Sequence, residues 1–87
     1  MYRLELWQRS IWQKETRFYR LELCQDLFSN WIVQKTWGSA VKLDYGRTNS
    51  IICSDYQTGL REYQKQQLRR QVRGYKNLEF LSSSTNK

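Results

Sequence analysis

The segment "YRLELCQDLFSNWIVQKTW" (Tyr19–Trp37) predicts a β-hairpin, and the rest of the 87-residue chain is arranged around it. In its first part, Tyr19–Gln25, apolar residues alternate with Arg and Glu, which is typical of a half-buried strand. The middle part, Asp26–Asn30, supplies the Asp, Ser and Asn of a turn. The last part, Trp31–Trp37, is rich in aromatic and β-branched residues and predicts an antiparallel partner strand that Gly38 ends.

The N-terminal residues repeat the first strand pattern. "YRLELWQ" (Tyr2–Gln8) matches Tyr19–Gln25 except that Trp7 stands where the second copy has Cys24. We therefore predict a strand over Tyr2–Gln8, joined to the next strand by the polar stretch Arg9–Thr16. Two copies at this short spacing do not make a solenoid, so they are interpreted as two strands of similar pattern.

After the hairpin, the pattern predicts a loop, a strand and then a helix. Residues Ser39–Asn49 are predicted to form the loop, and strand character returns in "TNSIICS" (Thr48–Ser54). Ser54 and Gln57 fit a capping box, in which their side chains bind free amides of the first helical turn. The helix should end at Arg73, because the next residue is a glycine.

The expected helix is amphipathic and covers one face of the sheet. Gly59 weakens a helix by about 1 kcal/mol relative to Ala, so we expect close packing there. Tyr75, which follows Gly74, should fold back on the apolar face. The predicted fold class is α+β, an antiparallel sheet of about four strands packed on one C-terminal helix, with a single domain over residues 1–81 and a disordered tail over 82–87. The predicted apolar stripe consists of Tyr56, Leu60, Tyr63, Leu68 and Val72.

Charge and composition favour an anionic partner and argue against an enzyme. The formal net charge of +7 indicates nucleic acid first, while a basic surface that only keeps the protein soluble is an equal alternative. The chain has no histidine, the usual general base and metal ligand, so we expect no enzyme, no metal and no cofactor. No apolar run reaches the about 20 residues of a membrane span. Two scattered cysteines without an apolar leader predict a reducing, cytoplasmic location.

Two groups of basic residues are candidate nucleic-acid contacts. Lys65, Arg69 and Arg73 fall on one side of the predicted helix, although an exposed helix face is more often merely solvated. The second group surrounds the glycines at 38 and 46, where glycine lets amides approach a phosphate and tryptophan offers a flat stacking surface. A core tryptophan beside a flexible loop is an equal alternative for this second group. It consists of Lys35, Trp37, Lys42 and Arg47.

The order of the motifs resembles the WGR domain. The similarity runs from about Arg17 to Tyr75 and rests on "FYRLEL", the pair of tryptophans ending in "WG", "GRT", and a helix closing in "RGY". WGR domains are sheet-plus-helix folds found beside the catalytic domain of DNA-break-sensing poly(ADP-ribose) polymerases and as small bacterial proteins. The resemblance implies DNA-end binding, with Trp37 and Gly38 as the motif residues and Gly46–Arg47 matching the bacterial Gly-Arg.

The third motif position departs from the family, because Ser39 stands in place of arginine. Serine cannot replace the planar fork of an arginine at a phosphate. Either Lys42 or Arg47 therefore compensates, or this member lacks end binding.

The leading hypothesis is a non-enzymatic nucleic-acid-binding module without base-sequence preference, with DNA favoured over RNA and no small-molecule substrate. Its contacts would be Trp37 and Gly38 at the turn, with Arg47, Lys42, Lys35 and the Lys65, Arg69 and Arg73 ridge on phosphate. The alternative is a protein-interaction module that docks by the edge of the repeated strands or by Trp7 or Trp12. Buried tryptophans at 7 and 12 would favour the first hypothesis, and exposed ones the second.

Overall fold

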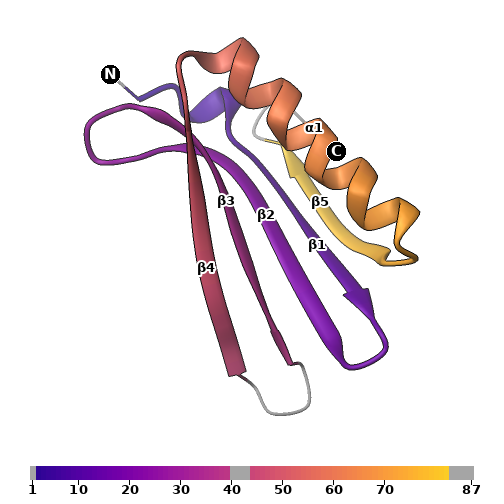
Figure 1. Cartoon of the computed structure of the whole chain (residues 1–87). Coiled ribbons are helices and arrows are strands. Elements are labelled where there is room, and N and C mark those ends of the chain that lie inside the picture. The colour runs from indigo at the N-terminus through magenta and orange to yellow at the C-terminus, as the bar shows by residue number, and fades with distance from the viewer. Residues whose placement is uncertain (1, 40–43, 83–87) are drawn as a thin grey trace.

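The computed structural model of the chain describes residues 2–39 and 44–82. One antiparallel sheet has the strand order β4-β3-β2-β1-β5, and a single helix, α1, lies on one of its faces (Figure 1). The α+β prediction is confirmed, with five strands rather than about four. The elements are a short 3-10 helix over Leu4–Leu6, then β1 (Gln8–Lys14), β2 (Arg17–Gln25), β3 (Trp31–Ser39), β4 (Asp44–Cys53), α1 (Tyr56–Val72) and β5 (Lys76–Ser82).

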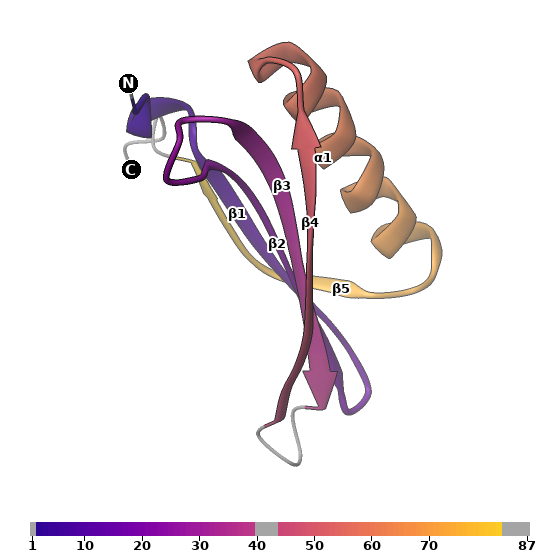
Figure 2. The same cartoon turned by 60° about the vertical axis from the view of Figure 1, so that its left-hand side comes forward.

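The helix covers only part of the sheet. Figure 2 shows the sheet almost edge-on with α1 on one side, and the lower ends of β2, β3 and β4 extend beyond the last helical turn. The core lies between the helix and the upper part of the sheet. It is built from Trp12, Leu21, Leu23, Val33, Cys53 and Tyr63.

The first copy of the repeat does not form the predicted strand. Its residues Leu4–Leu6 form the 3-10 helix, and β1 begins at Gln8, inside the stretch predicted as a polar connector. The second copy is β2, where Leu21 and Leu23 are fully buried, whereas Leu4 of the first copy is 56% exposed. Strand formation depends on burial against neighbouring elements, which Leu21 and Leu23 have and Leu4 lacks.

The predicted hairpin is confirmed, and its turn is held by one aspartate. Strands β2 and β3 pair in register from Arg17↔Ser39 to Gln25↔Trp31. The Asp26 carboxylate accepts hydrogen bonds from the Phe28 and Asn30 amides, both at 2.9 Å. These bonds fix the turn, in the manner of an Asx-turn.

The prediction of a loop over Ser39–Asn49 is wrong for most of its length, because β4 begins at Asp44 and β3 continues to Ser39. The register shifts between Trp37 and Ser39, so that one residue of β3 faces two of β4. Gly46 lies in this β-bulge with φ +62°, and a Cβ there would lie 2.0 Å from the backbone oxygen of Trp37. The backbone conformation and the close Trp37 oxygen therefore require glycine at position 46.

The N-cap of the helix lies one residue later than predicted. Asp55, rather than Ser54 with Gln57, is the N-cap, and its carboxylate accepts the Thr58 amide at 2.8 Å. Close packing at Gly59 is confirmed, since a Cβ there would lie 3.0 Å from Leu23 Cδ1.

The buried stripe of α1 differs from the predicted one. Leu68 and Val72 are 60% and 77% exposed, whereas Gln66 and Arg70 are buried. The buried positions are spaced by four, three and four residues, which keeps them on one helical face, and Leu68 falls off that face. They are Gly59, Tyr63, Gln66 and Arg70.

Tyr63 ties the helix to the sheet at the centre of the core. Its hydroxyl donates to Ser10 Oγ at 3.1 Å, and Trp12 Nε1 donates to the same oxygen at 2.9 Å. Burial, partly opposed by the hydrogen bond to Ser10, raises the pKa of Tyr63 to about 12. The phenol therefore stays neutral and acts as a structural hydrogen-bond donor.

Candidate nucleic-acid interface

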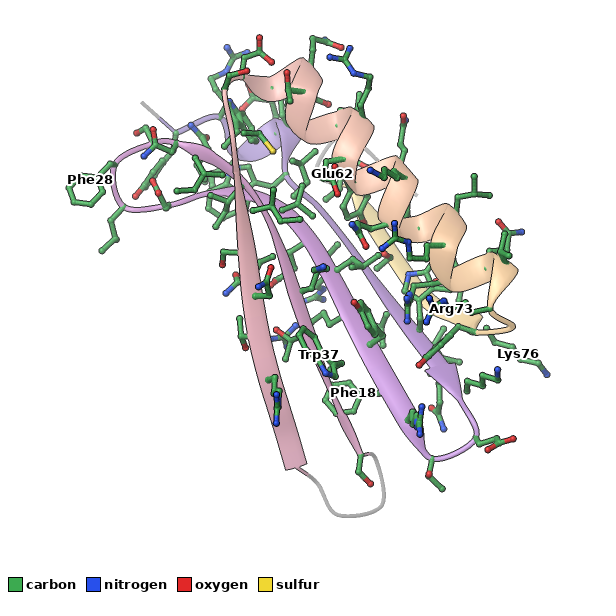
Figure 3. All side chains as sticks on the ribbon, viewed as in Figure 1. Phe18, Phe28, Trp37, Glu62, Arg73 and Lys76 are labelled. Carbon is green, nitrogen blue, oxygen red and sulfur yellow. The ribbon has the colours of Figure 1, made fainter. Side chains whose placement is uncertain are left out.

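A hollow of about 560 Å³ lies where the last turn of α1 meets the ends of β2 and β3. Its floor comes from residues 17–19 and 37–39 of the two strands, and its wall from Arg70, Arg73 and Tyr75. In Figure 3, Trp37 and Phe18 lie over the lower part of the strands, and Arg73 lies at the end of the helix above them. No Asp or Glu of the described residues lines this hollow.

The floor carries a row of aromatic rings set by the strand register. Trp12, Tyr19 and Trp37 are cross-strand partners on β1, β2 and β3. The rings of Tyr19 and Trp37 are stacked, with centroids 5.8 Å apart and planes 14° apart. Trp12 is covered by the core, whereas Tyr19 and Trp37 are only half-buried. The row therefore changes from core to accessible surface at the hollow.

The wall follows from the way in which "RQVRGY" ends the helix. Gly74, with φ +91°, donates to the carbonyl of Gln71, and the Tyr75 amide donates to the carbonyl of Arg70 at 3.0 Å. This pair of bonds is a Schellman motif, which the Gly74 prediction anticipated. It turns Tyr75 back toward the sheet, as predicted, where its ring meets Tyr19 edge-on at 6.0 Å.

Arg70 is the unusual residue of the hollow. Its side chain is buried to 6% exposure, and its guanidinium carbon lies 4.1 Å from the Tyr19 ring centroid and 5.0 Å from that of Tyr75. In the part of the chain that the structure describes, no carboxylate pairs with Arg70, and its buried Nε has no hydrogen-bond partner. A buried cation without an anion costs several kcal/mol, and cation–π contacts offset only part of that.

Two further arginines surround the opening. Arg73 belongs to the helix end, and Arg17 is the first residue of β2. Lys14 adds a positive charge beside them, because its Nζ donates to the Arg73 carbonyl at 2.7 Å. The hollow thus combines stacking surfaces with guanidinium groups that can bind a phosphate.

The structure brings some of the predicted site residues together. Trp37, Gly38 and Arg73 line the hollow. Arg47 is the exposed cross-strand neighbour of Trp37 on β4, and Lys35 lies two residues before Trp37 on β3.

The other predicted residues are not in the hollow. Lys65 lines a separate depression on α1 with Arg61 and Leu68. Arg69 is exposed and is not among the residues of the hollow. Lys42 lies outside the described residues.

Six lining residues were not predicted as site residues: Arg17, Phe18, Tyr19, Ser39, Arg70 and Tyr75. The signal for the last two was present in "RGY", because a Schellman end places the residue after glycine against the helix residue five positions before it. The sequence alone does not single out Arg70, because a charged residue in a basic helix is expected to be solvated.

The tryptophans of the alternative hypothesis are not a surface patch. Trp12 is 5% exposed and belongs to the core. Trp7 is partly buried, and its Nε1 donates to Gln25 Oε1 at 3.2 Å. The repeated sequence does not supply a sheet edge either, since β2 is the central strand and the edges of the described sheet are β4 and β5.

The cysteines are poor nucleophiles. Burial and the nearby Glu22 and Asp26 raise the pKa of Cys24 to about 11, and burial also raises the pKa of Cys53. Both thiols therefore stay protonated at neutral pH. Among the described residues there is no group of three or more acidic, cysteine or histidine side chains suited to a metal ion. The helix of the described chain is also not long and apolar enough to cross a membrane.

Comparison of the chain with protein-family models, with curated proteins and with solved structures gives no match. The resemblance to the WGR domain therefore stays a prediction from the sequence motifs.

Proposed function

We propose that this chain is a non-enzymatic nucleic-acid-binding module that binds through the hollow at the end of α1. The observation that carries the proposal is Arg70, a buried cation beside aromatic rings with no carboxylate partner in the described chain. A phosphate would supply the missing anion, while Trp37 stacks on a base or sugar. Arg17 and Arg73 at the opening would share the phosphate charge. The WGR-like motifs make DNA the first nucleic acid to test, and a cytoplasmic location is part of this proposal.

The proposal is tested by the salt dependence of binding to a fluorescent oligonucleotide. If Arg17, Arg70 and Arg73 contact phosphates, raising the salt concentration from roughly 50 to 200 mM should lower the affinity by about 20–40-fold. Trp37→Ala should weaken binding by about 1–3 kcal/mol.

A matched pair of variants separates local contacts from net charge. Arg73→Gln and Arg61→Gln each remove one exposed positive charge from the same helix, but only Arg73 lines the hollow. We expect a clear loss of affinity for the first and almost none for the second. Equal losses, or a shallow salt response, would contradict the proposal.

A second candidate is docking on a protein partner through the β2–β3 turn. Leu27 and Phe28 are 88% and 83% exposed at its tip, and the Asp26 carboxylate holds the turn through hydrogen bonds from two of its amides. Neighbouring exposed apolar side chains of this kind are typical interface residues. Proximity labelling in the source cells should then recover a partner with the native chain and lose it with Phe28→Ser. Identical labelling by the two proteins would exclude this turn as the docking site.

A further inference from the structure

The hollow presents aromatic rings and guanidinium groups side by side at one opening, and this arrangement bears on the form of nucleic acid that fits. We infer that the hollow takes one unpaired nucleotide of a single strand, rather than a base pair of a duplex. This inference rests on the proposed function and specifies its ligand.

Inside a duplex, each base is covered on both faces by its neighbours, and a protein that contacts the phosphates reaches only base edges through a groove. A ring such as Trp37 can stack on a base only when that base is unstacked. Arg73 and Trp37 line the same hollow, so a single nucleotide would have to offer its phosphate and its base face together. In a single strand, every nucleotide can offer its phosphate and its base face in this way.

The end of a duplex also exposes a base face. A terminal base pair needs a flat surface as wide as two bases. The rings of Tyr19 and Trp37 are stacked on one another, with planes 14° apart, and Tyr75 stands across Tyr19 at 73° and forms a wall, so these three rings do not form one flat surface. The last turn of α1 closes the same side. A walled hollow of about 560 Å³ lies within the usual range of roughly 300–1,000 Å³ for one small ligand.

The base and the phosphate of the nucleotide each have a place in the hollow. Arg70 lies 4.1 Å from the Tyr19 ring, and Tyr19 stacks on one side of Trp37, so the side of Trp37 away from Tyr19 is the ring surface left for the incoming base. Arg17 and Arg73 are exposed and line the same hollow as Arg70, so their guanidinium groups are the ones that an entering phosphate meets first. The base therefore stacks on Trp37, and its phosphate meets the three arginines.

The experiment compares three ligands in one titration format with the full chain. They are oligo(dT) and oligo(rU) of about 12 nucleotides, and a blunt duplex of the same length without overhangs. We expect oligo(dT) and oligo(rU) to bind about tenfold or more tightly than the duplex, because only they offer unstacked bases. Trp37→Ala should abolish most of that preference, and Trp37→Phe should retain it. Phe28→Ala, an exposed aromatic at the opposite end of the sheet, should leave it unchanged.

The outcomes separate the inference from the function it rests on. If the duplex binds as tightly as the single strands or more tightly, the inference is overturned and the proposed function stands. If no ligand binds at low salt, both are overturned. A folded Trp37→Ala protein, verified by circular dichroism, that keeps the full preference would place the single strand elsewhere and also overturn the inference.

Discussion

Replacing Arg70 with methionine should separate binding from stability. The guanidinium contributes cation–π contacts with Tyr19 and Tyr75, worth roughly 1–2 kcal/mol each when desolvated. Against this stands the cost of burying a cation to 6% exposure without a carboxylate in the described chain, which is several kcal/mol. Methionine has a similar helix propensity and keeps sulfur–aromatic contacts of about 0.3–1.5 kcal/mol. The free energy of unfolding should therefore change by less than about 1 kcal/mol, or increase.

Binding should respond in the opposite way. The loss of a charge-assisted contact to phosphate is worth roughly 1.5–3 kcal/mol, which is about 10–100-fold in affinity. Urea unfolding followed by circular dichroism measures the first quantity, and anisotropy titration with oligo(dT) measures the second. Arg61→Met is the matched control, because it removes an exposed cation from the same helix.

Two results would refute this reasoning. A loss of more than about 3 kcal/mol in unfolding free energy would mean that Arg70 is primarily a structural residue with a compensated charge. Unchanged affinity in a folded Arg70→Met protein would remove the main support for the hollow as an anion site.

Three further predictions concern the scaffold. Gly46→Ala should destabilise the protein by about 1–3 kcal/mol in urea unfolding, because φ is +62° and the new Cβ would meet the carbonyl oxygen of Trp37. An unchanged unfolding midpoint would mean that residue 46 does not have this β-bulge conformation. Tyr63→Phe should cost about 1 kcal/mol at neutral pH by removing the bond to Ser10. The wild type should also lose stability as the pH rises from about 10 toward about 12, the raised pKa of Tyr63, and the phenylalanine variant should lack this component. Asp55→Ala should lower the free energy of unfolding at neutral pH, because the helix loses its N-cap. The difference between the two proteins should shrink as the pH falls through the pKa of Asp55, which lies below 3.8, because only the ionised carboxylate contributes the extra capping stability.

The part of the fold that the sequence predicts is the part fixed by local chemistry. The β2–β3 hairpin carries both an alternating pattern and the turn residue Asp26, whose hydrogen bonds form within four residues. The end of α1 is likewise local, because Gly74 adopts the left-handed conformation that a Schellman motif requires. Such features need no knowledge of distant segments.

The errors concern elements whose structure depends on partners far along the chain. Strand β1 has a mixed polar sequence and exists because it pairs with β2 on one side and β5 on the other. The first repeat copy has the better strand pattern but is not between two strands. For the same reason, β5 and the early start of β4 were not predicted from their own residues.

The candidate site shows the same division between local and distant causes. Trp37 and Arg73 were identified from their residue types, and both line the hollow. Arg70 was missed because a charged residue in a basic helix is expected to be solvated. Arg70 is buried because it contacts Tyr19, a residue of β2 that lies 51 positions earlier in the sequence. The periodicity of the helix cannot reveal such a contact.

The geometry also bears on the serine that departs from the WGR motif. From the sequence, either Lys42 or Arg47 compensates for the arginine missing at Ser39, or the chain lacks end binding. Ser39 lines the hollow, but so do Arg70 and Arg73, which reach it from the helix. Under the proposed function, phosphate binding therefore does not need an arginine on the strand, because the helix end already supplies two. A small side chain at position 39 then keeps the opening clear for the nucleotide, and Ser39→Arg should narrow it rather than restore a lost contact.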